Sequence, residues 1–327
     1  MKLGIVGSGM IVQEFLKITP ELTETKLTAI CCTSRSEVTG RSMADRCHIS
    51  NVFLNYEDFL DSSIDTVYIT VPNHLHFEFA KKALEAGKHV IVEKPFTSTY
   101  QEAVQLCTLA RKKKLFLFEA ITTLYLPNYR EIKSCLPELG RIKIVQCNYS
   151  QYSSRYDRFK AGEVLPTFDP KCSGGALMDL NIYNIHYVVG LFGKPENVEY
   201  FPNMERGIDT SGILILNYKD FQCTCIGAKD CRPVILNSIQ GEMGCIIQDS
   251  PANVCTDFEW IKKDGTSSKF NVNERGHRMI YEFLEFQQMI QNNQYERCNE
   301  MMEHTLIVCE VQDSARKKAG IIFPADK

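Results

Sequence analysis

The sequence predicts an α/β protein with a doubly wound parallel sheet in its first third and a large, mostly antiparallel open sheet in its second part. Up to residue 120, apolar strand candidates alternate with amphipathic helices, and a glycine cluster joins the first strand to the first helix. This alternation predicts a parallel sheet covered by helices on both faces. Beyond residue 197, strand candidates follow one another without helices between them, which predicts an antiparallel sheet.

The first domain is expected at residues 1–120. Most of its strand candidates are short apolar runs without strict alternation, and the helix candidates between them have helical spacing. Gly87 suits the left-handed cap of the fourth helix. The expected strands lie at 2–6, 27–32, 52–53, 66–70, 89–93 and 115–120, and the expected helices at 10–18, 36–46, 56–61, 76–87 and 99–113.

The second domain is expected at residues 121–327. A helix is predicted at 128–136, a strand at 142–150, a polar loop at 151–173 and a strong helix at 176–192. Turn signals separate the strands that follow, and two helices close the chain. These strands are expected at 197–201, 211–218, 221–228, 233–240, 243–248 and near 255–272, and the helices at 277–292 and 298–318.

The composition is typical of a globular protein, and the net charge does not indicate a polyanionic partner. The 327 residues are 44% hydrophobic and 24% charged, and the net charge of −3 gives no reason to expect nucleic acid or an anionic membrane surface. The apolar N-terminal stretch is too short and too interrupted for a signal peptide or membrane span. Fourteen cysteines occur without any C-x-x-C spacing, many of them inside apolar runs. They are read as buried thiols of a cytoplasmic protein, and no metal site is expected.

The glycine cluster predicts a dinucleotide site. Gly7 permits a tight turn after the first strand, Gly9 lets the backbone approach a pyrophosphate, and the helix N-terminus offers unpaired N–H groups to the anion. Val12 occupies the third small position of G-x-G-x-x-G, so the motif is incomplete. Its position after the first strand of a β/α alternation supports the assignment.

The end of the second strand favours NADP(H) over NAD(H). An NAD site usually has a carboxylate there, but this chain reads Cys32-Thr33-Ser34-Arg35 and has no acid before Glu37. A hydroxyl and a guanidinium suit a 2′-phosphate. The alternative is that Arg35 only stacks on the adenine, which leaves NAD(H) possible.

Two polar segments follow later strands of the same sheet. His74 and His76 could be taken for a metal pair, but no third ligand is apparent, so helix capping or cofactor contact is the preferred interpretation. Lys94, in Glu93-Lys94-Pro95, lies at the mouth of the sheet, where a lysine can donate a proton or hydrogen bond to a substrate oxygen. The tripeptide could also be an ordinary surface turn.

The helix at 176–192 carries three polar side chains on an otherwise apolar segment. Asp179, Tyr183 and His186 lie at i, i+4 and i+7, so they are expected to share one face. Such groups need partners or a function when buried. A satisfied core network and a substrate site are both open at this point.

Four stretches resemble the Gfo/Idh/MocA oxidoreductases, closest to the branch of glucose–fructose oxidoreductase and dimeric dihydrodiol dehydrogenase. They are GIVGSGMI (4–11), VPNHLHFEFAKKALEAGKHVIVEKP (71–95), FEAITTLYLP (118–127) and SGGALMDLNIYNIHYVVGLFG (173–193). The resemblance implies a Rossmann domain followed by a domain whose open sheet often serves dimerisation. It therefore implies a homodimer or higher homo-oligomer.

The resemblance also implies residue roles. Lys94 matches the catalytic lysine of E-K-P, and Asp179 and Tyr183 match the D-x-x-x-H/Y pair. Asn181 and Ser173 stand where the family usually has glycine, and His186 has no general counterpart. With the motif residues, the expected cofactor-binding set is Gly7, Ser8, Gly9, Met10, Ile11, Ser34, Arg35, Thr70, Pro72, Asn73, His76, Glu93 and Lys94, and the expected substrate set is Tyr156, Asp179 and His186.

These residues predict hydride exchange between a nicotinamide and a secondary alcohol or carbonyl of a sugar, cyclitol, small diol or dicarbonyl compound. Tyr183 would pass the proton with help from Lys94, and Asp179 would orient the substrate hydroxyl or Lys94. Which of Lys94 and Tyr183 is the acid/base stays open. The alternative function is a dinucleotide-binding regulator without catalysis. The whole hypothesis depends on Lys94 facing the helix of Tyr183 across the bound coenzyme.

Overall fold

The computed structural model describes residues 1–327, which form two compact units. The first unit contains Met1–Ala120 and Met279–Leu306, and the second contains Ile121–Arg278 and Ile307–Lys327. The boundary between Leu306 and Ile307 falls inside the last long helix, α10 (Tyr295–Lys318). Each unit has its own sheet and its own apolar core.

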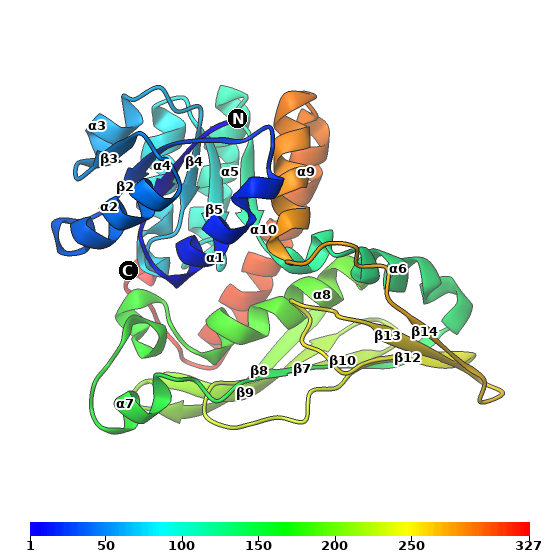
Figure 1. Cartoon of the computed structure of the whole chain (residues 1–327). Coiled ribbons are helices and arrows are strands. Elements are labelled where there is room, and N and C mark those ends of the chain that lie inside the picture. Colours follow the sequence, from blue (N-terminus) through cyan, green and yellow to red (C-terminus); the bar gives the residue numbers. More distant parts are fainter. The chain divides into compact units, whose positions relative to one another are not determined.

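The first unit is built on a six-stranded parallel sheet in the order β3-β2-β1-β4-β5-β6 (Figure 1). The chain runs outward from β1 to β3 and then returns to the other side of β1 with β4. This reversal is the topological switch point at which such sheets bind ligands. The strands are β1 (Lys2–Val6), β2 (Lys26–Cys31), β3 (Asn51–Phe53), β4 (Thr66–Ile69), β5 (His89–Glu93) and β6 (Leu117–Ala120).

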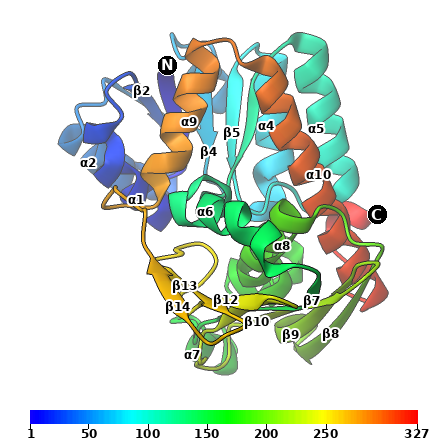
Figure 2. The ribbon, with the colours of Figure 1, turned by 90° about the vertical axis from the view of Figure 1, so that its right-hand side faces the viewer.

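The helices predicted between these strands are present, and α9 and the first half of α10 join them in the first unit. Figure 2 shows α4 and α5 side by side, and α9 close to α1. The prediction of a doubly wound parallel sheet in residues 1–120 is confirmed. The helices are α1 (Met10–Ile18), α2 (Glu37–Arg46), α3 (Tyr56–Leu60), α4 (His76–Glu85), α5 (Tyr100–Lys113), α9 (Met279–Gln291) and the first half of α10.

Helix α9 belongs to the first unit although the chain reaches it last. The ring of Phe283 packs against Phe15 and Tyr68, with centroid distances of 4.5 and 5.1 Å. The ring of Phe286 stacks on Phe118 at 4.5 Å. The sequence predicts one domain over 121–327, whereas residues 279–306 belong to the first unit, where these aromatic contacts lie.

The second unit is built on an eight-stranded sheet in the order β14-β13-β12-β11-β7-β10-β9-β8. Only β7 and β10 pair in parallel, so the expected mostly antiparallel sheet is confirmed. The strands are β7 (Ile142–Ser150), β8 (Asn197–Glu205), β9 (Ile208–Asn217), β10 (Gln222–Ala228), β11 (Asn237–Gly241), β12 (Gly244–Gln248), β13 (Phe258–Lys262) and β14 (Ser267–Phe270), and the helices are α6 (Pro127–Cys135), α7 (Tyr156–Lys160) and α8 (Ile182–Phe192).

Three local features differ from the sequence prediction. The strand expected at 233–240 begins only at Asn237, and the expected range opens on Pro233, which cannot donate to a strand ladder. The expected loop at 151–173 contains the short helix α7. The expected helix at 176–192 starts with a π-helical turn, Leu177–Asn181, before α8. None of the helices has both the length and the apolar composition needed to cross a lipid bilayer.

Candidate active site

The turn after β1 forms an open cradle. Gly7 has a φ of +117°, and a Cβ there would lie 2.4 Å from Thr70 Oγ1, so only glycine fits. A Cβ at Gly9 would meet no atom within 4 Å. Helix α1 starts directly after Gly9, with no side-chain cap and no acidic residue in its first turn. Its N-terminal N–H groups therefore suit an anion such as a pyrophosphate.

Thr70 and Gly7 meet at the switch point between β1 and β4. The Thr70 hydroxyl donates to the Val6 carbonyl at 2.7 Å, which ties the two strand ends together. Pro72 and Asn73 continue from β4 into a 3₁₀ turn at the same carboxyl edge. This part of the predicted cofactor set therefore lies at one edge of one sheet, with Ser8 and Ile11 partly exposed beside it.

The turn after β2 presents Ser34 and Arg35 to solvent. Glu37, the first acid beyond β2, forms an ion pair with Arg41 at 2.8 Å on α2. A carboxylate engaged in that way is a poor partner for a ribose hydroxyl. The exposed Arg35 guanidinium provides a planar donor group that suits a phosphate.

The Glu93-Lys94-Pro95 turn is held from several sides. The Tyr68 hydroxyl donates to the Glu93 carboxylate in a short hydrogen bond, and the Lys94 amide donates to its other oxygen at 3.2 Å. Burial raises the pKa of Glu93 to about 7, although the Tyr68 hydrogen bond and the Lys94 charge oppose that rise. The Lys94–Pro95 peptide is cis, and Lys94 is partly exposed.

His76 and Glu119 form further hydrogen bonds to the same turn. The ring nitrogens of His76 lie 2.8 Å from the Pro95 carbonyl and 2.9 Å from the Val71 carbonyl. Burial lowers the pKa of His76 despite these contacts, which favours the neutral imidazole. The Glu119 carboxylate accepts from the Phe96 amide at 3.1 Å. These contacts connect the turn after β4 with the turn after β5.

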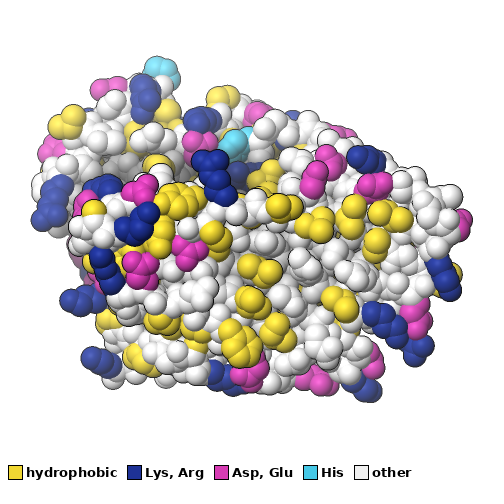
Figure 3. Space-filling model, turned by 90° about the horizontal axis from the view of Figure 1, so that it is seen from below, with side chains coloured by type: hydrophobic (Ala, Val, Ile, Leu, Met, Phe, Trp, Pro, Cys, Tyr) yellow, Lys and Arg dark blue, Asp and Glu magenta, His cyan; other side chains and the backbone are white.

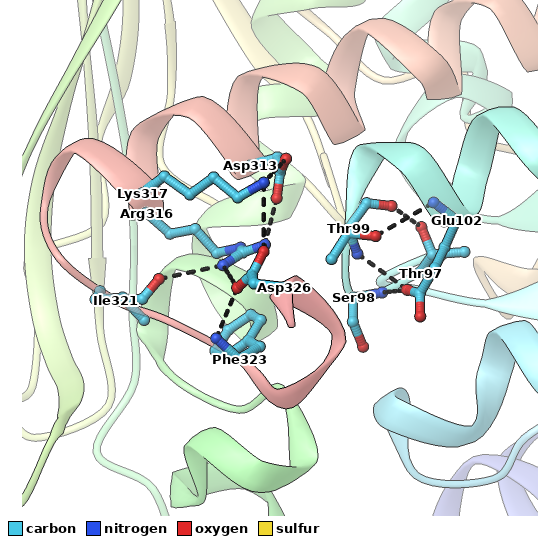
Figure 4. A network of polar contacts seen from close by, with 10 residues as sticks. All are labelled: Thr97, Ser98, Thr99, Glu102, Asp313, Arg316, Lys317, Ile321, Phe323 and Asp326. Atoms are coloured by element: carbon cyan, nitrogen blue, oxygen red, sulfur yellow. Dashed lines mark hydrogen bonds and ion pairs between the residues drawn. The ribbon is translucent and has the colours of Figure 1, made fainter.

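A capping box at the start of α5 fixes the residues that follow Lys94 (Figure 4). The Glu102 carboxylate accepts from the amides of Ser98 and Thr99, and the Thr99 hydroxyl accepts from the Glu102 amide at 3.2 Å. Both halves of the box satisfy helix N–H groups that would otherwise be unpaired. The backbone on either side of Lys94 is thus fixed by buried polar contacts.

In the second unit, the π-helical turn carries Asp179 and continues into α8 with Tyr183. Asp179 and Tyr183 are partly exposed, whereas His186 is completely buried. A π turn holds more residues than an α turn, so the register expected for i, i+4 and i+7 shifts along this segment. The shift falls between Asp179 and Tyr183, whereas Tyr183 and His186 keep regular α-helical spacing on α8.

Lys229 and Thr167 hold the Asp179 carboxylate. The Lys229 ammonium donates to Asp179 Oδ2 at 2.8 Å, and the Thr167 hydroxyl donates to the same oxygen at 3.0 Å. Tyr183 packs against Tyr149, with ring centroids 5.5 Å apart. Tyr156 lies on α7, and its hydroxyl donates to Glu205 at 3.0 Å.

Asp209 fixes the beginning of the π-helical turn. Its carboxylate accepts from the Leu177 amide and from the Tyr200 hydroxyl, both at 2.7 Å. Burial raises the pKa of Asp209 to about 6, and these hydrogen bonds together with the Lys229 charge limit the rise. A Cβ at Gly175 would lie 2.0 Å from Asp209, so glycine is required at that position.

Comparison with known proteins gives a consistent result over the whole chain. Residues 1–120 match the oxidoreductase family with an NAD-binding Rossmann fold that is named GFO/IDH/MocA, and residues 130–245 match the C-terminal domain of that family. The chain belongs to the Gfo/Idh/MocA oxidoreductase family.

Several relatives of this family match along their full length. The NADP⁺-dependent scyllo-inositol 2-dehydrogenase of Bacillus subtilis is 33% identical over 332 residues, with 100% of this chain and 99% of that protein covered. The trans-1,2-dihydrobenzene-1,2-diol dehydrogenase of Sus scrofa is 24% identical, with 100% and 99% covered. Among solved structures, a 3-ketoreductase from Actinomadura kijaniata in complex with NADP and TDP-benzene has the same fold, with a TM-score of 0.83, 22% identity and 97% of each chain covered.

In this Gfo/Idh/MocA member, the predicted site residues fall into two sets. Lys94 and the predicted cofactor residues lie in the first unit, while Asp179, Tyr183, Tyr156 and His186 lie in the second. Their roles in binding and catalysis stay predictions. Glu119, Lys229 and Asp209 are not among the residues predicted from the sequence. The available signal was a charged residue inside or directly beside an apolar strand, as in LFLFEA and CTCIGAK.

Proposed function

We propose that this protein is an NADP(H)-dependent dehydrogenase or reductase for a secondary alcohol or carbonyl of a sugar, cyclitol or small diol. The observation that carries the proposal is the full-length match to an NADP⁺-dependent scyllo-inositol 2-dehydrogenase in a chain that has Lys94 after β5 and the Asp179–Tyr183 pair. The open cradle at Gly7 and Gly9 fits a dinucleotide. A bound nicotinamide supplies the hydride exchange.

The residues of the chain handle the proton and the orientation of the substrate. Tyr183 passes a proton to or from the substrate oxygen, and the ammonium of Lys94 stabilises the phenolate form. Asp179 accepts a hydrogen bond from a substrate hydroxyl and thereby orients it. For this, Lys94 and Tyr183 must act on the same substrate. The proposal therefore keeps the hypothesis, made from the sequence, that Lys94 and Tyr183 face each other across the bound coenzyme.

A spectrophotometric screen tests the function directly. NADP⁺ and NAD⁺ are offered with polyols and aldoses, and NADPH and NADH with α-dicarbonyls. Turnover of at least one substrate with NADP(H) is the expected result. Tight NADPH binding without any turnover, together with a stable protein partner, would support the regulator instead.

Arg35 is expected to select NADPH. Replacing Arg35 by Ala removes a charge-assisted contact to the 2′-phosphate, so the Kd for NADPH should rise about 10- to 100-fold while the Kd for NADH stays nearly constant. Fluorescence titration of both cofactors measures this difference. Arg41→Ala is the matched control, because Arg41 is engaged with Glu37 on α2. An equal loss for both cofactors would contradict the assignment.

We also propose a homodimer formed through the outer face of the eight-stranded sheet. Along β9, Leu214 and Leu216 are completely buried, but Ile213 on the other face is 43% exposed. Phe201, its cross-strand neighbour on β8, is 62% exposed. Figure 3 shows hydrophobic side chains spread over this side of the molecule. Exposed apolar side chains on neighbouring strands favour a protein–protein contact on this face.

Charges on this face should prevent dimer formation. The double variant Phe201→Glu with Ile213→Glu places two carboxylates on neighbouring strands, where their desolvation would oppose association. Light scattering after size exclusion should give a dimer for the wild type and a monomer for the variant. Val38→Glu serves as the control, because Val38 is 83% exposed on α2 of the first unit. A monomeric wild type would disprove this part of the proposal.

The burial of most cysteines supports a cytoplasmic location. Ten of the fourteen, among them Cys147, Cys223 and Cys225, lie in the apolar cores and behave as small hydrophobic side chains. Reducing conditions keep such thiols unmodified.

A further inference from the structure

Lys229 is a lysine in an unusual place. It follows β10 directly, and only 1% of its surface is exposed. Its backbone is fixed on both sides, because its amide donates to the Thr210 carbonyl and its carbonyl accepts from the Ser153 amide, both at 2.8 Å. Lysine is almost never fully buried unless it is paired. The position therefore calls for an explanation.

The ammonium of Lys229 is surrounded by three oxygen atoms. It donates to the Thr167 carbonyl at 2.7 Å, to the Thr167 hydroxyl and to Asp179 Oδ2 at 2.8 Å. These acceptors equal in number the donors of an ammonium group. The ring of Phe168 lies 4.5 Å from the nitrogen and closes the site with a cation–π contact.

Local structure brings Thr167 into this position. The amide of Gly175 donates to the Thr167 carbonyl, so that carbonyl accepts from Lys229 and from the segment leading into the π turn. A Cβ at Gly174 would lie 2.8 Å from the carbonyl carbon of Thr167, which explains the glycine there. The loop, the π turn and the end of β10 thus meet at the Lys229 ammonium.

Nearby carboxylates have donors of their own. Asp209 accepts from the Leu177 amide and the Tyr200 hydroxyl, and Asp230 accepts from the hydroxyls of Thr210 and Ser211. Asp179 is the carboxylate that Lys229 contacts directly. The side chain of Asp179 is 31% exposed, whereas that of Lys229 is 2% exposed. The pair therefore has a buried cation behind a carboxylate that solvent can reach.

We infer that Lys229 is a positioning residue that keeps Asp179 ionised and in a fixed orientation toward the substrate hydroxyl. This inference rests on the proposed function, because it assigns Asp179 to substrate orientation. Stability alone is a weak reason for the lysine, since replacing a buried ion pair with apolar side chains is often neutral or stabilising. A fixed carboxylate, in contrast, is what orientation of a reacting hydroxyl requires.

The test compares Lys229→Met with Lys229→Arg and with the exposed control Lys219→Met in the turn between β9 and β10. Lys229→Met should lower kcat/KM by about 10²-fold, because a misplaced orienting group costs about that much. The Kd for NADPH should not change. Lys229→Arg should recover part of the loss, because it restores the cation, and Lys219→Met should behave as wild type.

A double-mutant cycle separates positioning from a general structural role. In the Asp179→Asn background, Lys229→Met should lower kcat/KM by less than about 3-fold more, because both changes act through the same carboxylate. Additive losses, or full activity of Lys229→Met, would overturn the inference. Should Lys229→Met fail to fold, Thr167→Val replaces it, and about a 10-fold loss is expected from the missing hydrogen bond.

The same variants separate this inference from the proposed function. A wild type that turns over no substrate ends the proposed function. The crystal structure of Lys229→Met then decides about Lys229 without any activity measurement. A displaced Asp179 carboxylate supports the positioning role, and a carboxylate that keeps its place overturns it.

Discussion

Lys94→Ala and Tyr183→Phe should each lower turnover by about 10²-fold or more, the contribution typical of a general acid or base, while NADPH binding is retained. Lys94 stands in a turn whose backbone is fixed by His76, Glu119 and the capping box of α5. Truncating its side chain should therefore remove the ammonium without moving the backbone. Tyr183→Phe removes one hydroxyl and keeps the ring that packs against Tyr149.

Steady-state kinetics with the best substrate of the screen, together with a titration of NADPH, measures both effects. Lys81→Ala is the control for the lysine variant, because Lys81 is half-exposed on α4 and pairs only loosely with Glu85, at 3.7 Å. Loss of turnover in both variants with unchanged NADPH affinity is the expected pattern. Unchanged turnover in both variants would end the assignment of Lys94 and Tyr183.

The fold could be predicted because its signals are local. Each strand of the first sheet is a short apolar run, and the glycine cluster and the caps mark the helix ends within a few residues. The carboxyl ends of parallel strands must meet at one edge, so Gly7, Thr70 and Lys94 could be assigned to the same edge from the sequence alone. Long-range contacts were not needed for this part.

The remainder depends on contacts between residues that are distant in the sequence. Lys229 meets Asp179 across 50 residues, and Thr305 donates to Glu119 across 186 residues. A buried charge can be recognised from its apolar neighbours, but its partner cannot. The π-helical turn before α8 could not be predicted either, because its residues have the composition of an ordinary α-helix.

The end of the chain illustrates the same limit and leads to the second large effect. Arg316 belongs to the basic run Arg316-Lys317-Lys318 at the C-terminus of α10, a pattern typical of a solvated helix end, but it is completely buried. Its guanidinium donates to both oxygens of Asp326 at 2.5 and 2.7 Å, to the Ile321 carbonyl at 3.1 Å and to Asp313 (Figure 4). It also lies 4.4 Å from the ring of Phe323. The segment that follows α10 thus packs around the Arg316 guanidinium through Ile321, Phe323 and Asp326.

Arg316→Met should lower the free energy of unfolding of the second unit by about 3–5 kcal/mol, because it leaves the partly buried carboxylates of Asp326 and Asp313 without their buried cation. Urea denaturation measures this loss. Arg297→Met is the matched control on the same helix, because Arg297 pairs with Glu285 but is 43% exposed. That variant should lose less than about 1 kcal/mol. Equal losses in the two variants would disprove a special role for the buried pair.

The pH dependence of stability gives an independent check on the same cluster. Burial alone would raise the pKa of Asp326, but hydrogen bonds from Arg316 and from the Phe323 amide hold that pKa at about 2. A carboxyl whose pKa is lower in the folded state stabilises the fold above its unfolded pKa and loses that contribution as the pH falls. The wild type should therefore lose stability between about pH 4 and about pH 2. In Asp326→Asn this slope should become smaller, and an unchanged slope would show that Asp326 does not carry it.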